Sequence, residues 1–265
     1  MLTTLALTAS LSLLPAQAAP MNLTQVGATY GALGAPRKDN QLLPGDQVFV
    51  AFNIEGITVA PDGRVLYSMA TEVLNTQGKV VFSQDPRDLE AINALGGTSL
   101  PAFAQLDVGL DSPPGEYTVR VTVTDRASKH QAVLNQKFQV LKKAFGLVRL
   151  TTTMDPESRI SASVFESGAS CWVNCGVVGF GQNSQGQPQV TVELRVLDDK
   201  GQLTLAKPFT GEIGQDVPSK LASLPVQFHL GLNRAGRFTV ELKATDRVSN
   251  KTAVLAFPIT VVAPR

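Results

Sequence analysis

The sequence is poor in charged and aromatic residues. Asp, Glu, Lys and Arg make up 17% of its 265 residues, against about 25% in an average globular protein, and they balance to a net charge of +1. This balance argues against a basic nucleic-acid binder, and a hydrophobic content of 43% argues against a disordered chain. We therefore expect a folded protein whose partners do not include nucleic acid.

The sequence has only two histidines, His130 and His229, which fall at different places in the chain. A histidine-based metal site or a Ser-His-Asp triad needs more partners than these. The motifs H-E-x-x-H, G-x-S-x-G, Walker A and the EF-hand loop are absent. We therefore expect no enzyme activity, no catalytic residue, no metal and no cofactor.

Long apolar runs are missing after the N-terminus, so nothing there reaches the roughly 18 to 20 apolar residues of a membrane-spanning helix. Residues 1–18 are an apolar stretch with Pro15 followed by Ala16-Gln17-Ala18, the small-x-small pattern that precedes signal-peptidase cleavage. We expect residues 1–18 to be a signal peptide, and the mature protein to be secreted or periplasmic, without a membrane span.

What the sequence does contain is an internal repeat. Residues 115–141 align without gaps on residues 236–262, and 11 of 27 positions are identical. Upstream segments align at an offset of 123, namely residues 45–57 with 168–180 and residues 73–80 with 196–203. The alignment predicts a duplicated unit of about 120 residues.

The hydrophobic period within each copy is two. From Tyr117 to Val123 every second residue is apolar, and the second copy keeps this phase from Phe238 to Ala244. An antiparallel strand that is half-buried on a core requires this alternation. We expect Tyr117 and Phe238 to point into the core of their copies.

These signals predict an all-β fold class: two tandem antiparallel immunoglobulin-like β-sandwich domains from an internal duplication, at residues 19–143 and 144–265. Further strands are expected near residues 21–30, 47–57, 65–75, 79–83, 103–110, 147–154, 170–180, 189–198, 202–206 and 225–232. A short helix is expected in the first copy over residues 85–95, because Asp85 is a good helix cap, Pro86 suits the first turn and Gly96-Gly97 would end it.

The segment from Pro114 to Asp125, PGEYTVRVTVTD, resembles bacterial immunoglobulin-like and fibronectin type III-like extracellular modules, whose penultimate strand commonly begins G-x-Y/F-x-V and ends near an Asp. The resemblance covers both copies through their closing hairpins. It implies a sandwich fold and says little about activity, since such folds host many functions. It also implies that the Tyr117 hydroxyl forms a corner with the backbone, which Phe238 cannot do.

Aspartates at the ends of sandwich strands are candidate Ca²⁺ ligands. Only Asp125 and Asp246 are retained in both copies, and each is followed by an arginine, Arg126 or Arg247. We expect a structural role, in which each carboxylate bonds the turn backbone or pairs with its neighbouring arginine.

Cys171 and Cys175 lie four residues apart in an apparent strand. A secreted location favours a disulfide, but residues so spaced in an extended strand are about 13 Å apart, beyond the roughly 7 Å limit between bridged Cα atoms. Either the strand bulges near Asn174 or two thiols are buried on one face, and we favour buried thiols. Trp172, between them, aligns with Phe49 and is expected to pack in the core.

The functional hypothesis is a secreted or cell-envelope, non-enzymatic binding or structural module. It would bind another envelope or extracellular macromolecule through its sandwich surfaces or end loops. A periplasmic pilus-type chaperone with two immunoglobulin-like domains is one alternative, although matching halves without a basic cleft motif speak against it. A hydrolase accessory domain or a protease inhibitor is the other.

Overall fold

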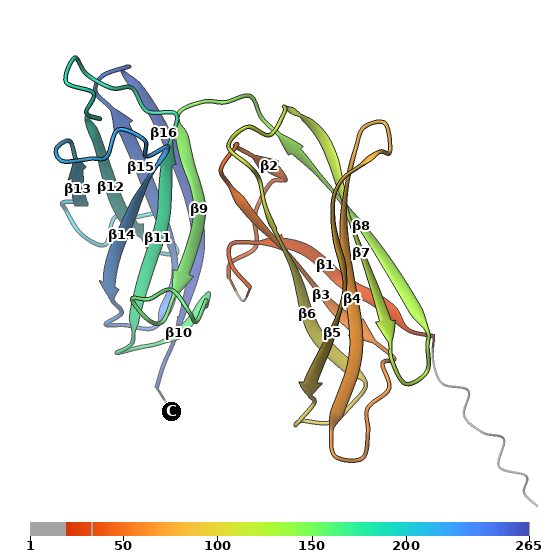
Figure 1. Cartoon of the computed structure of the whole chain (residues 1–265). Helices are drawn as coiled ribbons and strands as arrows, with labels where there is room; N and C mark the ends of the chain where they lie inside the picture. Colours follow the sequence, from red (N-terminus) through yellow and green to blue (C-terminus); the bar gives the residue numbers. More distant parts are fainter. Residues whose placement is uncertain (1–19, 33, 265) are drawn as a thin grey trace, which may run out of the picture.

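A computed structural model describes residues 20–32 and 34–264, and in these ranges the protein is all-β, with no helix. The expected signal peptide, residues 1–18, lies outside the described residues. The strands form four sheets, arranged as two side-by-side bodies joined by the segment after β8 (Figure 1). Within the described ranges, no helix is available to cross a membrane.

The first body consists of two sheets that face each other across one core. One sheet has the order β1-β3-β6, with β1 at Asn22–Thr29, β3 at Gln47–Glu55 and β6 at Ser99–Asp107. The other has the order β2-β8-β7-β4-β5, with β2 at Gln41–Leu42, β8 at Gln131–Val140, β7 at Gly115–Asp125, β4 at Arg64–Asn75 and β5 at Val80–Ile92. Alternate residues of both sheets fill the core, among them Val50, Phe52, Val119 and Val121.

The second body repeats this plan. One sheet has the order β14-β11-β9, with β14 at Ser223–Gly231, β11 at Ser170–Val178 and β9 at Gly146–Thr153. The other has the order β10-β16-β15-β12-β13, with β10 at Val164–Glu166, β16 at Lys251–Val262, β15 at Gly236–Asp246, β12 at Val190–Leu197 and β13 at Phe209–Ile213. Val173, Val192, Val240 and Leu242 are among its fully buried core residues.

The two bodies also share a local irregularity. The register between β1 and β3 shifts after Thr24, and the register between β9 and β11 shifts at Arg149. At these bulges Gln25 and Arg149 have left-handed backbone angles, with φ of 51° and 54°. Non-glycine residues seldom adopt this conformation, so the same bulge in both bodies is a specific point of likeness.

The predicted helix over residues 85–95 is wrong, because this segment is most of strand β5. Strand β5 pairs antiparallel with β4 from Arg64↔Ile92 to Leu74↔Val80. A helix of two or three turns is marginal by itself, whereas the long hairpin with β4 satisfies the backbone and half-buries Leu89 and Ala91 in alternation. Long-range pairing therefore overrides the capping signals.

Two smaller differences concern the edges of the sheets. The strand expected at residues 202–206 lies at Phe209–Ile213 as β13, and Leu203 forms only an isolated bridge to Leu197. The short parallel strands β2 and β10 were not predicted, because two or three residues carry no periodicity.

The two bodies are in direct contact. Tyr30 and Ala35, from the segment after β1, belong to the core cluster of the second body, where the Tyr30 ring lies 6.3 Å from the ring of Phe257. The guanidinium of Arg37 lies 4.7 Å from the centre of the Tyr30 ring. The first body therefore contributes side chains to the hydrophobic core of the second.

A buried ion pair lies at this contact. Arg37 and Asp46 form a salt bridge of 3.0 Å, and both side chains are 5% exposed. Asp46 also accepts hydrogen bonds from the backbone amides of Gln47 and Arg149, at 2.8 and 2.7 Å. One carboxylate thus joins a loop of the first body to the bulge in β9 of the second.

Candidate functional site

The retained aspartates tie together the two sheets of each body. Asp125, 1% exposed at the end of β7, accepts hydrogen bonds from the amides of Ala127 and Ser128 and from the Ser128 hydroxyl. It also accepts one from the amide of Thr58, at 2.9 Å, in the loop that follows β3 of the facing sheet. The carboxylate therefore bonds its own turn and the opposite sheet.

Asp246 occupies the matching place in the second body and is fully buried. It accepts hydrogen bonds from the amide of Val248 and the hydroxyl of Ser249 in its own turn, and from the amide of Gly181 after β11. Gly181 stands 123 residues after Thr58, the offset of the upstream part of the repeat. Both carboxylates therefore join equivalent parts of the chain.

Burial opposes ionisation of Asp125, but the hydrogen bonds from Thr58, Ser128 and Ala127 outweigh it and lower its pKa to about 2. The same balance lowers the pKa of Asp246, with Ser249, Gly181 and Val248 as donors. The carboxylate oxygens are thus occupied by N–H and O–H donors. Within residues 20–32 and 34–264 no three His, Cys, Asp or Glu side chains gather closely enough to hold a metal ion.

The neighbouring arginines pair elsewhere. Arg126 forms a salt bridge of 3.2 Å with Asp88 on β5, and Arg247 forms one of 3.1 Å with Glu212 on β13. Both pairs are solvent-exposed, so each contributes little to stability. Of the two structural roles expected for the aspartates, bonding to the turn backbone is the one present.

Tyr117 and Phe238 occupy equivalent positions with different surroundings. Tyr117 is half-buried, stacks on Phe138 at 5.7 Å and donates a hydrogen bond of 2.9 Å from its hydroxyl to the carbonyl of Pro113. This is a hydroxyl-to-backbone contact of the kind that the resemblance implies. Phe238 is buried, and the guanidinium of Arg234 lies 5.0 Å from its ring centre.

Cys171 and Cys175 are free thiols that point into the second core. Burial raises the pKa of each thiol to about 12, so neither forms a reactive thiolate at neutral pH. Trp172 lies between them on the opposite face of β11, where it is half-buried and packs against His229 in a tilted arrangement, with ring centres 4.5 Å apart. The expectation that Trp172 packs in the core is therefore wrong.

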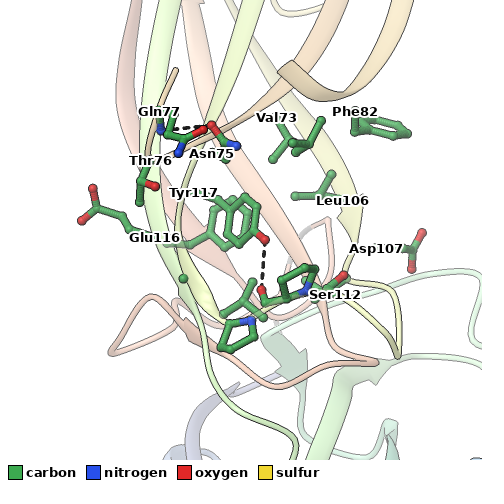
Figure 2. Close-up of a pocket in the computed structure, with 17 residues that line it drawn as sticks. Val73, Asn75, Thr76, Gln77, Phe82, Leu106, Asp107, Ser112, Glu116 and Tyr117 are labelled. Carbon is green, nitrogen blue, oxygen red and sulfur yellow. Dashed lines mark hydrogen bonds between the residues drawn. The ribbon is translucent and has the colours of Figure 1, made fainter. Parts of the chain in front are cut away.

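The site of greatest interest is an apolar cleft of about 560 Å³ at one end of the first body. Figure 2 shows Tyr117 within it, hydrogen-bonded to the Pro113 carbonyl, together with Val73 and Leu106. Phe82 of β5 also lines the cleft and is 48% exposed. Polar side chains, among them Asn75, Gln77, Asp107, Ser112 and Glu116, also line the cleft.

A groove of about 730 Å³ continues from this cleft along the side of the first body. The cleft and the groove share Phe82, Leu106 and Asp107. Tyr67 and Met69 of β4 line the groove between the residues of β5 and those of β6. Together, the cleft and the groove form a continuous apolar channel between two edge strands.

The second body has a cleft of about 460 Å³ in the equivalent place, lined by Val196, Leu205, Phe238 and Ile259. The positions that match these in the first body are Val73, Phe82, Tyr117 and Phe138, all in the first cleft. In the second body, however, the position where Ala104 stands is taken by Phe228. An added Cβ at Gly211 of β13 would lie 3.8 Å from the Phe228 ring, so this ring reaches across toward the other sheet.

The sequence reasoning missed the channel, although one signal for β6 and β14 was present. Residues 99–106 and 223–230 share Ser-Leu-Pro at their start and a Leu at their end, at an offset of 124. This extends the repeat to the strands that form the channel wall. The sequence does not reveal which strands lie at sheet edges.

No family model matches the chain, and no curated protein matches it. Among solved structures, it is similar to the alkylpurine DNA glycosylase AlkC of Pseudomonas fluorescens bound to abasic-site DNA (14% identity, TM-score 0.30, 47% of this chain and 31% of that one). It is also similar to red sea bream transglutaminase, with 9% identity, a TM-score of 0.28, and coverage of 90% of this chain and 31% of that one. A third similar structure is the C-terminal domain of the Streptococcus pyogenes antigen I/II-family protein AspA. The identity is 10% and the TM-score 0.28, and the match covers 92% of this chain and 99% of that one. The chain thus spans about a third of the length of the first two proteins. We take no function from structural similarities this distant.

Proposed function

We propose that this chain is a secreted or cell-envelope binding module, without enzymatic activity, built from two tandem immunoglobulin-like domains that arose by duplication. The matching strand orders, the matching bulges at Gln25 and Arg149, and the equivalent carboxylates of Asp125 and Asp246 support the duplication. The domains are residues 19–143 and 144–265, after a signal peptide at residues 1–18.

The observation that carries the binding function is the exposure of Phe82 at the junction of the cleft and the groove. Its side chain is 48% exposed, and the neighbouring Val81 is 52% exposed. Large apolar side chains gathered around a concave surface are typical of binding sites. The partner is another envelope or extracellular macromolecule, which buries this surface when it binds.

Site-specific photocrosslinking in the cells that produce the protein tests this proposal. The photoreactive residue p-benzoylphenylalanine replaces Phe82 in one variant and Val254 in the control. Val254 is 59% exposed on β16 of the second body, outside both clefts. We expect a discrete adduct with a macromolecule from position 82 only, in the secreted or periplasmic fraction. Equal adducts from both positions, or none from position 82, would refute the proposal.

A further inference from the structure

The channel of the first body lies between two strands that each have a free edge. Among the described strands, β5 pairs only with β4, and β6 pairs only with β3. The outer backbone groups of such strands are available to pair with another chain.

Strand β5 is protected against pairing. Its register shifts twice against β4, at Asp85-Pro86 and at Val81, and Pro86 has no backbone N–H to donate. Four charged side chains, Asp85, Arg87, Asp88 and Glu90, follow within this strand. Bulges, proline and charge are the devices by which natural proteins prevent strand addition at an edge.

Strand β6 has almost none of this protection. From Ser99 to Leu106 it carries no charged residue, its register against β3 is continuous, and its only proline, Pro101, lies near its start. The exposed side chain of Phe103 adds an apolar surface. Residues 102–107 therefore offer an open edge beside the groove.

The groove also contains a charge without a partner. Of the charged residues that line it, Asp107 pairs with Arg149 at 2.7 Å, whereas no ion pair involves Arg87 among the described residues. Arg87 lies on the β5 wall, across the groove from β6. Arg87 is exposed to solvent in the unbound protein, and an incoming segment that carries a carboxylate here would pair with it.

From these observations we infer that an extended segment of a partner protein adds as a strand to the free edge of β6. This inference rests on the proposed binding function and specifies its mode. The segment alternates apolar and polar side chains. Its apolar side chains enter the groove beside Tyr67 and Met69, and a carboxylate pairs with Arg87. Main-chain hydrogen bonds to β6 provide affinity, and the alternate side chains provide specificity.

The second body provides a reason why only the first accepts such a segment. There, the ring of Phe228 reaches toward Gly211 from the position that Ala104 occupies in the first body. This ring occupies space between the two edge strands of the second body. In the first body Ala104 is itself buried and lies outside the groove lining, whereas Ala102, on the same face of β6, lines the groove. The substitution Ala102→Phe is therefore expected to place a ring in the groove of the first body.

The test uses the full mature protein and a phage-displayed library of random 12-residue peptides. We expect enriched peptides to alternate apolar and polar residues and to contain Asp or Glu. On binding, they should slow amide hydrogen exchange at residues 102–107. Arg87→Ala should weaken binding about tenfold, Ala102→Phe should abolish it, and Lys200→Ala, in an exposed turn of the second body, should leave it unchanged.

Because Ala102→Phe can also disturb folding, a second measurement leaves the protein unaltered. Each backbone amide of the best peptide is N-methylated in turn. Strand addition predicts at least a tenfold loss of affinity at every second position and little loss at the positions between. A loss without this alternation, or the enrichment of no peptide, would overturn strand addition. An adduct at position 82 in the crosslinking experiment would then still support binding through the channel.

Discussion

The carboxylate of Asp125 allows a quantitative prediction about acid stability. Folding lowers its pKa from an ordinary value of 3.8 to about 2, because the hydrogen bonds from Thr58, Ser128 and Ala127 favour the ionised form more than burial disfavours it. This difference corresponds to about 2 kcal/mol of folding free energy at neutral pH.

The direction of the pH effect follows from the lowered pKa. Between pH 3.8 and about pH 2 the unfolded chain binds this proton more readily than the folded chain does. The contribution is therefore fully present above about pH 4 and is lost as the pH falls through about 2. Asp246 shifts in the same direction and adds to the loss.

The perturbation is Asp125→Asn, which keeps the shape of the side chain and removes its ionisation. The new amide N–H₂ also faces the N–H of Thr58, which then lacks an acceptor. We expect the variant to be about 2 to 3 kcal/mol less stable than the wild type at pH 7. The gap should narrow by about 1.5 kcal/mol at pH 2.5, because that pH still lies above the folded pKa.

Urea unfolding followed by far-UV circular dichroism, at pH 7, 4, 3 and 2.5, measures this gap. Asp199→Asn, in an exposed turn of the second body, is the matched control and should follow the wild type at every pH. A gap that stays constant from pH 7 to pH 2.5 would refute the reasoning, since the loss would then be steric and not due to ionisation.

Three further predictions concern the aromatic sites, the thiols and metal ions. In urea unfolding, Tyr117→Phe should lower the free energy of unfolding by about 1 kcal/mol, because the hydrogen bond to Pro113 is lost. Phe238→Ala should lower it by about 3 to 5 kcal/mol, because the substitution empties a buried aromatic site. An effect of Phe238→Ala below about 1 kcal/mol would contradict the burial of this ring. The thiols of Cys171 and Cys175 should react with Ellman's reagent only when urea unfolds the protein, because burial keeps them protonated. Fast labelling of the native protein would contradict this prediction, since it would show that the thiols are accessible. EDTA and millimolar Ca²⁺ should leave the melting temperature unchanged, because N–H and O–H groups of the protein already donate hydrogen bonds to the carboxylate oxygens of Asp125. A calcium-dependent rise in the melting temperature would mean that a metal site exists.

Local periodicity was sufficient where one strand face is buried and the other is exposed. The alternation around Tyr117 and Phe238 located β7 and β15, because a period of two places every second side chain in the core regardless of the strand's neighbours. For Trp172, reasoning from the repeat failed. Its alignment with Phe49 suggested the core, whereas the phase of β11 buries Cys171 and Val173 and places Trp172 on the opposite face.

The segment from Asp85 to Leu95 shows the limit of local signals. Its cap, its proline and its terminal glycines favour a helix, and nothing within the segment indicates that β4 extends far enough to pair with most of it. The energy that decides between the two forms comes from pairing with residues of β4 that lie 18 to 28 positions away, from Met69↔Arg87 to Arg64↔Ile92. Sequence reading that treats each segment alone therefore assigned the wrong structure.

The sequence by itself determined the all-β class, the repeat and most strands, because burial on one core imposes a periodicity that can be read along the chain. Only the tertiary structure decided which strands lie at edges, how Asp125 reaches Thr58, and how the Phe228 ring comes to face Gly211 in the second body. These features depend on contacts between strands distant in the sequence. An open edge or a groove is a property of the assembled sheets, because it exists only where pairing and packing stop.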